Sequence, residues 1–502
     1  MNTTYGVVAI ALVSLATLAI GAFGLRMSRT TSDFYVASRS VSPALNSSAI
    51  GGEYLSAASF LGVAGLVLAY GADMLWYPIG WTTGYLMLLV FVAAPLRRSG
   101  AYTIPDFAQV RLQSTRVRRV ASLLVVAIGW LYLMPQFQGA GLTIRTVTGA
   151  PGWVGTVLVA VVVVINVVSG GMRSITFVQA FQYWLKLTAL LVPAFFLVAA
   201  WRGDGRPSPV APSDWFDPFG STDPHAMYLT YSVMAATFLG TMGLPHVVVR
   251  FYTNPDGRAA RRTTLIVLAL LGVFYLLPTV YGVLGRIYAS DLVDSGRTDA
   301  VVLELPSRVL GGELGEVLAA LLTAGAFAAF LSTSSGLTMS LAGVVGQGLA
   351  ASRAGVRIGL SGVTALRLAA VAMVVVPLGL ALAADRISVA NSVTFAFALA
   401  ASTFCPLLVL GIWWRGLTPA GAITGLIGGG LCAGIAPVFT IAARPEGWTG
   451  ALLSQPALWS VPVGFALMVG VSLLTRGSIP TTVARTMVRL HTPERLDVVR
   501  EP

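Results

Sequence analysis

Glu53 has the strongest case for chemistry, because it is the one acidic residue inside an apolar run of the chain. Its surroundings, AIGGEYLSAASFLGVAG (49–65), also contain Gly51–Gly52, which can open a helix, and the hydroxyl of Ser56. Glycines and serines alone are typical of close helix packing. A carboxylate within a membrane, however, costs about 3 kcal/mol on insertion scales. Its presence therefore favours a functional site over simple packing.

A second polar stretch is FLGTMGLPHVVVRF (238–251), in which Gly243 and Pro245 break the helical pattern next to His246. Backbone groups in hydrocarbon must be satisfied inside their own segment, so a broken helix is tolerated only where it lines a cavity. The break therefore indicates a binding region. A lone buried histidine is equally often a structural hydrogen-bonded group, and the sequence leaves both readings of His246 open.

Hydroxyl and amide groups form the remaining polar clusters. The stretch AFAAFLSTSSGLTMS (326–340) has six Ser or Thr residues within nine positions, starting at Ser332 and Thr333. One such hydroxyl can bond the carbonyl of residue i−4, but six together suggest oxygen ligands for a hard cation. Amides at Gln136, Gln138 and Asn391 suit a small polar solute, or they join helices to one another.

Composition places all these groups in a membrane. The chain is 56% hydrophobic and only 10% charged, and its mean hydropathy is +0.80. An average soluble protein carries about 25% charged residues. The chain therefore cannot cover a water-facing surface with charge, which excludes a soluble enzyme and a disordered protein.

The apolar runs predict an all-α polytopic membrane protein. A helix needs about 20 apolar residues to cross the hydrocarbon core, and β-barrel strands would instead be short and alternating. The charge-free stretch 317–352 has no clear turn signal, so we predict one extended helix there. We predict thirteen spans, over 5–25, 44–70, 74–96, 120–144, 152–169, 175–200, 226–249, 263–287, 317–350, 362–384, 388–412, 419–442 and 457–475.

Sorting the charges by side of the membrane supports this count. With an external N-terminus, the predicted cytoplasmic segments hold 22 arginines, Arg250 among them, and six acids. The external segments and span ends hold eight arginines and thirteen acids. Basic residues concentrate on the cytoplasmic side of membrane proteins. We therefore predict that the N-terminus is outside and the C-terminus cytoplasmic. Within the spans, snorkelling explains Arg367, and the sequence gives Lys186 no preferred role.

Several other functions are excluded. The net charge of +12 would suggest nucleic acid for a soluble protein, but here it follows from topology, so we expect the lipid bilayer and no nucleic acid as a partner. The chain has no GxxxxGK[ST] phosphate loop and no zinc spacing among its three histidines and two cysteines. No nucleophile–base arrangement is visible. We expect no enzyme activity and no cofactor.

Eight motifs extend from the first predicted cytoplasmic loop to the twelfth span: TSDFYVASRSVS (31–42), GGEYLSAASFLG (51–62), YTIPDFAQVR (102–111), QFQGAG (136–141), SGGMRSITFVQ (169–179), GLPHVVVRFYTNPDGRAARRT (243–263), SSGLTMSLAG (334–343) and FALAASTFCPLLVLGIWWRGLTPAGA (397–422). Through these motifs the chain resembles the sodium:solute symporter family, in particular the bacterial cation/acetate and monocarboxylate symporters. The sequence EYLSAASFLG (53–62) is typical of the acetate-type branch.

The resemblance implies a leucine-transporter-type fold in a single transporter domain. The breaks near 51–53 and 240–245 would each lie in the first helix of one of two inverted five-helix repeats, where such folds bind their substrates. The implied parts of the domain, 1–502, are an extra first helix (5–25), repeat 1 (44–200), repeat 2 (226–412), two additional helices (419–475) and a cytoplasmic tail (476–502).

The resemblance also implies a sodium site. Its ligands would be the carbonyls of Gly52, Leu55 and Ala329 and the hydroxyls of Ser332 and Thr333. The last three residues share one helix face because they are spaced i, i+3 and i+4. The Ser-Thr pair favours sodium over protons as the coupling ion.

At the substrate position the chain departs from related sequences. The proline-transporting members carry an aspartate where this chain has Tyr54. The acetate-type members usually carry an aspartate at the place of Glu53, which keeps the charge on a longer arm. Glu53 could therefore serve as a second, protonatable cation site.

We expect a secondary-active symporter of the bacterial cytoplasmic membrane, monomeric or weakly oligomeric. It would couple inward flow of Na⁺, or of H⁺, to uptake of acetate, propionate or pyruvate by alternating access. Alternatives are another solute (an amino acid, pantothenate, urea or a sugar) or a membrane sensor, for which the tail after 476 is short. Coupling and substrate contacts are expected from Glu53, Tyr54, Ser56, Gln136, Gln138, Gly243, Pro245, His246 and Asn391.

Overall fold

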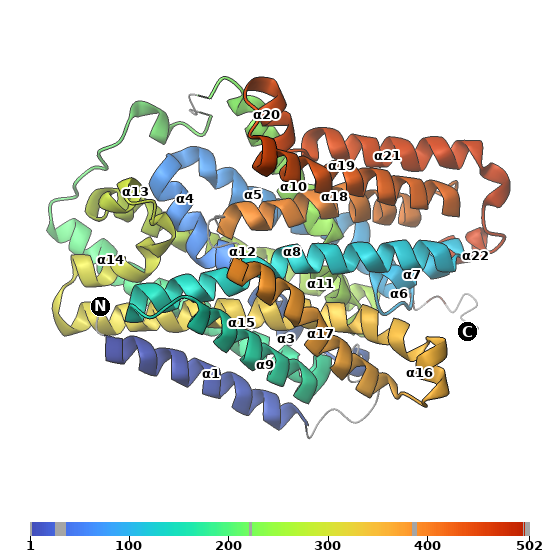
Figure 1. Cartoon of the computed structure of the whole chain (residues 1–502), viewed down its shortest axis with the longest axis horizontal. Coiled ribbons are helices and arrows are strands. Elements are labelled where there is room, and N and C mark those ends of the chain that lie inside the picture. The colour runs from blue at the N-terminus through green and yellow to red at the C-terminus, as the bar shows by residue number, and fades with distance from the viewer. Residues whose placement is uncertain (1–2, 26–36, 220–222, 384–388, 495, 497–502) are drawn as a thin grey trace.

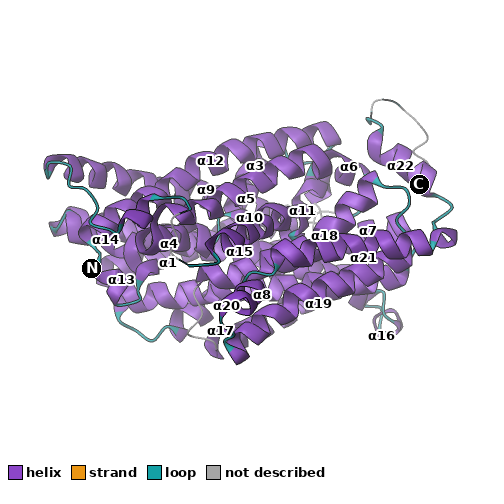
Figure 2. Cartoon of the chain, turned by 90° about the horizontal axis from the view of Figure 1, so that it is seen from above, coloured by secondary structure: helices purple, strands orange, loops and turns teal. Residues whose placement is uncertain are grey.

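The computed structural model of the chain is a bundle of helices (Figures 1 and 2). The structure describes residues 3–25, 37–219, 223–383, 389–494 and 496, and these residues contain no β-strand. The predicted all-α class is confirmed.

Most helices of the bundle are long, and the shorter helices connect them, several at the two ends of the bundle and α11 in its interior (Figure 1). The bundle helices are α1 (Thr3–Leu25), α3 (Pro43–Tyr54), α4 (Val63–Tyr70), α5 (Trp76–Met87), α8 (Thr115–Thr148), α9 (Trp153–Gly203), α10 (Ala226–Gly243), α12 (Gly257–Tyr288), α15 (Gly312–Ala350), α17 (Gly362–Ala383), α18 (Val389–Trp413), α19 (Pro419–Ala443) and α21 (Ala457–Leu474). The shorter helices are α6 (Ala93–Arg98), α7 (Ile104–Leu112), α11 (Pro245–Val249), α13 (Asp291–Asp294), α14 (Val301–Val309), α16 (Arg353–Arg357), α20 (Gly447–Ser454) and α22 (Val483–His491).

Eleven helical segments of the described residues are long and apolar enough to cross a membrane. Two of them are interrupted by a glycine with positive φ, Gly71 (φ 79°) and Gly171 (φ 61°). Glycine adopts this backbone conformation readily because it has no Cβ. Each interruption falls between two neighbouring predicted spans. The count of thirteen and the boundaries of the two repeats stay predictions.

The helix α15 is continuous over 39 residues. The prediction of one long helix, and not two spans, is therefore confirmed for this region. Its middle, from Gly325 to Ala342, is buried at every position. A helix that is apolar and buried all round is typical of the centre of a membrane bundle, and α15 packs there against α9, α8 and α17.

The two ends of the bundle differ in charge. The arginine-bearing helices α16 and α22 lie at one end, and the acidic helix α13 lies at the other (Figure 1). The tail helix α22 is held there because Arg98 of α6 forms an ion pair with Glu494 at 3.3 Å. This separation agrees with the predicted sorting of charges by membrane side, and the orientation itself stays a prediction.

Both central helices, α3 and α10, are interrupted, but the first break is not where we predicted it. Gly51 and Gly52 are helical, and α3 ends at Tyr54, followed by non-helical backbone at Leu55 (φ −74°, ψ 87°). The two glycines are needed for packing, because a Cβ on Gly52 would lie 2.1 Å from the carbonyl oxygen of Gln179 on α9. The second break falls within the predicted stretch, at Leu244 (φ −69°, ψ 118°).

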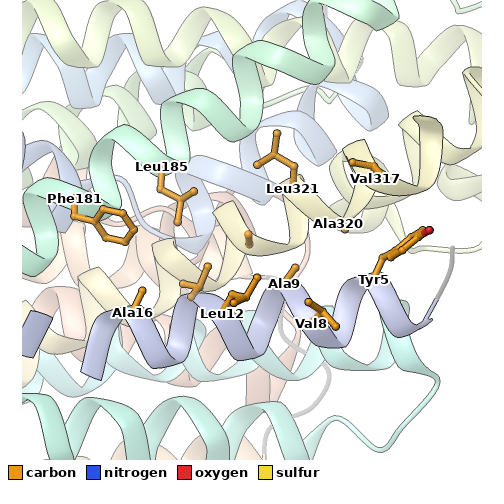
Figure 3. A pocket seen from close by; sticks show the side chains of 12 residues that line it. Tyr5, Val8, Ala9, Leu12, Ala16, Phe181, Leu185, Val317, Ala320 and Leu321 are labelled. Carbon is orange, nitrogen blue, oxygen red and sulfur yellow. The ribbon is translucent and has the colours of Figure 1, made fainter. Parts of the chain in front are cut away.

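An apolar groove of about 510 Å³ lies on the outer face of the bundle (Figure 3). Side chains of α1, α9 and α15 line it, among them Leu12, Leu185 and Leu321. None of the predicted site residues lines this groove.

Candidate functional site

The two helix interruptions are joined by a buried hydrogen bond. The hydroxyl of Tyr54, the last residue of α3, lies 2.8 Å from the hydroxyl of Thr241 in the last turn of α10. The chain separation between them is 187 positions. The two interrupted helices are therefore in direct contact. Gly243 lets α10 pack closely against α18, because a Cβ there would lie 2.4 Å from the carbonyl oxygen of Ala400.

Glu53 is bound in an ion pair within the bundle. Arg250 Nε donates to Glu53 Oε2 at 2.6 Å, and the two side chains are 1% and 2% exposed. Arg250 Nη1 donates to Thr176 Oγ1 at 2.9 Å, and Nη2 donates to Gln179 Oε1. Arg250, which we predicted in a cytoplasmic segment, is buried, because the 3₁₀ turn Arg250–Thr253 folds it back against α3 and α9. An unpaired buried charge would be far more costly than this pair.

The predicted sodium ligands surround an ammonium group. Lys186 Nζ, on α9, donates to the carbonyl oxygen of Gly52 at 2.5 Å, to that of Leu55 at 2.7 Å and to Ser332 Oγ at 3.1 Å. An ammonium has three N–H donors and no acceptor. Its three donors are thus matched by three oxygens from two different elements, and Lys186 is fully buried.

The other two predicted ligands lie next to this group and have different partners. Thr333 Oγ1 donates to the carbonyl oxygen of Glu53 at 2.6 Å, and the carbonyl oxygen of Ala329 accepts from Ser332 Oγ at 3.0 Å. The last four carbonyls of a helix have no partner within it. At the end of α3, Lys186 and Thr333 supply partners for such carbonyls and hold α3 against α15.

The contacts of Lys186 decide whether a sodium ion fits among these oxygens. The sodium ion that the resemblance implies would have to share Gly52, Leu55 and Ser332 with a fixed positive charge. Two unit charges 4 Å apart repel by about 4 kcal/mol at an effective dielectric constant of 20. In this arrangement the oxygens therefore fit the ammonium and not an additional sodium ion. The predicted sodium site itself stays a prediction.

The two glutamines of α8 have different surroundings. Gln136 is buried, accepts from the backbone N–H of Ala57 at 2.9 Å and so fixes the chain just beyond the first break. Gln138 instead lines a separate cavity of about 470 Å³ together with Arg145 and Thr156. The structure therefore brings Gln136 to the interrupted helix and places Gln138 elsewhere.

Aromatic rings enclose the meeting point of the breaks. The ring of Tyr54 contacts those of Tyr85 (centroids 4.8 Å apart) and Phe397 (6.4 Å). Phe397 also contacts Trp81 at 5.9 Å and Tyr132 at 5.8 Å. Two polar atoms in this cluster, Trp81 Nε1 and Tyr85 Oη, are buried without a hydrogen-bond partner among the described residues. Buried donors without a partner are uncommon in folded proteins.

The remaining predicted residues lie around the same cluster. Pro245 starts α11, and His246 follows with its ring 5.0 Å from that of Tyr132. Neither nitrogen of His246 has a partner among the described residues. Ser56 is buried in the non-helical stretch after α3. Asn391 belongs to α18, and its side chain lies outside the described residues.

The sequence gave Lys186 no preferred role and did not connect Arg250 to the site, although both contact predicted site residues. A signal for Lys186 was available, because 31 of the 32 basic residues are arginines and Lys186 is the one lysine of the chain. Arg250 offered a weaker signal, since it directly follows an apolar run. Trp81 and Tyr85 could not be found, because many aromatic residues of this chain lie in apolar runs.

The fold and the site together define a membrane transporter of the leucine-transporter type, built around two interrupted helices. The model of the sodium:solute symporter family matches residues 34–429. The chain belongs to this family.

Two relatives match nearly the whole chain. One is an uncharacterised symporter of Bacillus subtilis, YwcA, which is 32% identical and covers 98% of this chain and 99% of its own length. The other is a monocarboxylic acid transporter of Corynebacterium glutamicum, also 32% identical, with 88% of this chain and 86% of its own length covered.

Solved structures support the fold. A Na⁺-coupled sialic acid symporter in a substrate-bound, outward-open state matches with a TM-score of 0.70 at 15% identity, covering 94% of this chain and 97% of its own. A nucleobase-cation-symport-1 family transporter in a closed conformation matches with a TM-score of 0.52 at 14% identity, covering 92% and 99%. At these identities the likeness concerns the fold alone.

Proposed function

We propose that this chain is a secondary-active symporter that takes up a small monocarboxylate, such as acetate, propionate or pyruvate, together with a cation, sodium or a proton. Transport would proceed by alternating access around the two helix interruptions, across a bacterial cytoplasmic membrane. The observation that carries the proposal is a pair of buried donors beside the break in α3, Trp81 Nε1 and Tyr85 Oη, for which the described residues supply no hydrogen-bond partner.

A small carboxylate suits these donors. An ionised carboxylate only accepts hydrogen bonds, and hydrogen bonds to a charged partner are stronger than those between neutral groups. The rings of Tyr54, Tyr132 and Phe397 would cover the short apolar part of the solute. Ligand sites in transporters of this type lie at interrupted helices.

The local charge also favours an anion. Glu53, Arg250 and Lys186 together carry one net positive charge when all three are ionised. The helix that resumes with the π-helical stretch Ala58–Gly62 directs its N-terminal end at the break, and a helix N-terminus carries partial positive charge. The similarity to the monocarboxylic acid transporter of C. glutamicum supports the same solute class.

Counterflow in proteoliposomes tests this proposal without any ion gradient. Vesicles preloaded with unlabelled pyruvate should take up labelled pyruvate, and acetate or propionate inside should replace pyruvate as the exchange partner. Pyruvate is the better label because, as the stronger acid, it leaks less through lipid in its neutral form. Protein-free liposomes give the background. Exchange with proline, pantothenate or a sugar, and none with the monocarboxylates, would overturn the assigned solute class.

A further inference from the structure

We propose that the ammonium group of Lys186 takes the place of the coupling sodium ion, so that the oxygens which the resemblance assigns to sodium hold none in this chain. This inference rests on the proposed function for its transport consequence. Its structural part, a lysine filling a cation site, stands on the contacts of Lys186 alone.

The first argument is the completeness of the coordination. Lys186 Nζ has three N–H groups and contacts three oxygens, those of Gly52, Leu55 and Ser332, at 2.5 to 3.1 Å. Two of these oxygens are backbone carbonyls at the end of α3, which carries the partial negative charge of a helix C-terminus. Such a site attracts a cation, and the ammonium group of Lys186 supplies that positive charge from the chain itself.

The second argument is the identity of the residue. All other basic residues of the chain are arginines, and the single lysine is at this position. An arginine would present a planar fork of donors. A lysine presents a compact charge with three donors. The position therefore has the shape and the charge of a bound cation.

The third argument is what the ammonium holds together. Lys186 extends from α9 and contacts two carbonyl oxygens at the end of α3 and one hydroxyl of α15. The ammonium thus clamps α3 against α15, as a cation bound by the same oxygens would.

The charged groups around Lys186 do not balance a second cation. On α3 the facing charged group is Glu53, which is neutralised by Arg250 from the 3₁₀ turn after α11. On α15 the facing groups are the hydroxyls of Ser332 and Thr333. None of these groups therefore offers a free negative charge to a sodium ion beside the ammonium.

Sodium binding to the purified protein tests the site without reference to the solute. We expect the same melting temperature in NaCl and in choline chloride for the wild type, because the ammonium blocks the ion. In Lys186→Ala the oxygens become free, so NaCl should raise the melting temperature, as any ligand that binds the folded state does. Leu185→Ala, which opens the neighbouring apolar groove instead, should show no effect of sodium. A wild type that is stabilised by sodium would overturn the proposal.

Transport driven by defined gradients tests the coupling. A sodium gradient at equal pH should not drive pyruvate accumulation by the wild type above protein-free liposomes. Accumulation driven by sodium alone in the wild type would overturn the proposal.

The two failures can be told apart. If pyruvate counterflow is present but accumulation requires sodium, the inference is wrong and the proposed function stands. If monocarboxylate counterflow is absent, the proposed solute is wrong, and the effect of NaCl on the melting temperature of Lys186→Ala still decides whether a lysine fills a cation site.

Discussion

Arg250 Nε lies 2.6 Å from Glu53 Oε2, and this buried ion pair joins the first interrupted helix to the segment that follows the second. The two residues are 197 positions apart. The pair means that the one acid within an apolar run is not a free charge in the centre of the bundle.

Removing one partner of this pair should be costly. We expect Glu53→Gln to destabilise the protein by about 3–5 kcal/mol, because Arg250 is left buried without a counter-charge. Unfolding of the purified protein measures the loss. The double variant Glu53→Gln with Arg250→Met should recover part of it, since no buried charge remains. A double variant as unstable as the sum of both single variants would contradict this account.

The contact between α3 and α9 should depend on the absence of a side chain at Gly52. We expect Gly52→Ala to lower stability by about 1–3 kcal/mol through overpacking, because the new Cβ would meet the carbonyl oxygen of Gln179. Gly272→Ala on the exposed face of α12 is the matched control, since no atom lies within 4 Å of its Cβ position. That variant should be neutral or slightly stabilising, as alanine is favoured over glycine in helices. Equal effects at both positions would refute the packing argument.

Tyr85 should affect the solute and not the fold. We expect Tyr85→Phe to weaken solute binding by about threefold to tenfold, as loss of one hydrogen bond does. Stability should stay unchanged or rise, because the hydroxyl has no hydrogen-bond partner in the part of the chain that the structure describes. Apparent KM in uptake assays and the melting temperature measure the two effects. Tyr281→Phe, whose hydroxyl donates to the carbonyl oxygen of Leu190 at 2.9 Å, should show the reverse pattern.

Asp299, in the 3₁₀ turn Thr298–Ala300 outside the spans, should make stability depend on pH. Burial against α4 raises the pKa of Asp299 to about 6, from a usual value of 3.8. The folded state therefore holds this proton more tightly than the unfolded chain does, so stability present at about pH 4 is lost as the pH rises through about 6. Melting temperatures between pH 4 and 7.5 should show this decrease in the wild type.

The same measurement on Asp299→Asn should show the decrease removed and a higher melting temperature at pH 7. Asp294→Asn, at an exposed position of the same loop, should retain the pH dependence of the wild type. An unaltered pH profile in Asp299→Asn would show that another group is responsible.

Much of the fold could be predicted from apolar run length alone, as the continuous helix α15 illustrates. The second helix break could be predicted because Gly243 and Pro245 surround Leu244, and proline disfavours helical backbone at the residue before it. The first break could not be located, because Gly51 and Gly52 remain helical to admit α9. A glycine pair looks the same in a sequence whether it breaks a helix or allows another helix to pack closely.

The resemblance implied the oxygens of this region but not its cations. The carbonyls of Gly52 and Leu55 and the hydroxyl of Ser332, which the resemblance implied as sodium ligands, converge in the structure on one group. The group that they contact is Lys186 Nζ of α9, which lies 134 positions from Gly52 in the chain. Hydropathy and spacing describe one segment at a time, so they cannot show which distant side chain enters a site.

The presence of a single lysine has a practical consequence for chemical labelling. Apart from the amino terminus, Lys186 Nζ is the one primary amine of the chain, and in this structure it is completely shielded from solvent. An amine-acylating reagent can therefore modify a single internal peptide, and only while the clamp between α3 and α15 is open to water. The rate at which that one peptide gains mass would record how often the transporter opens, with no engineered probe.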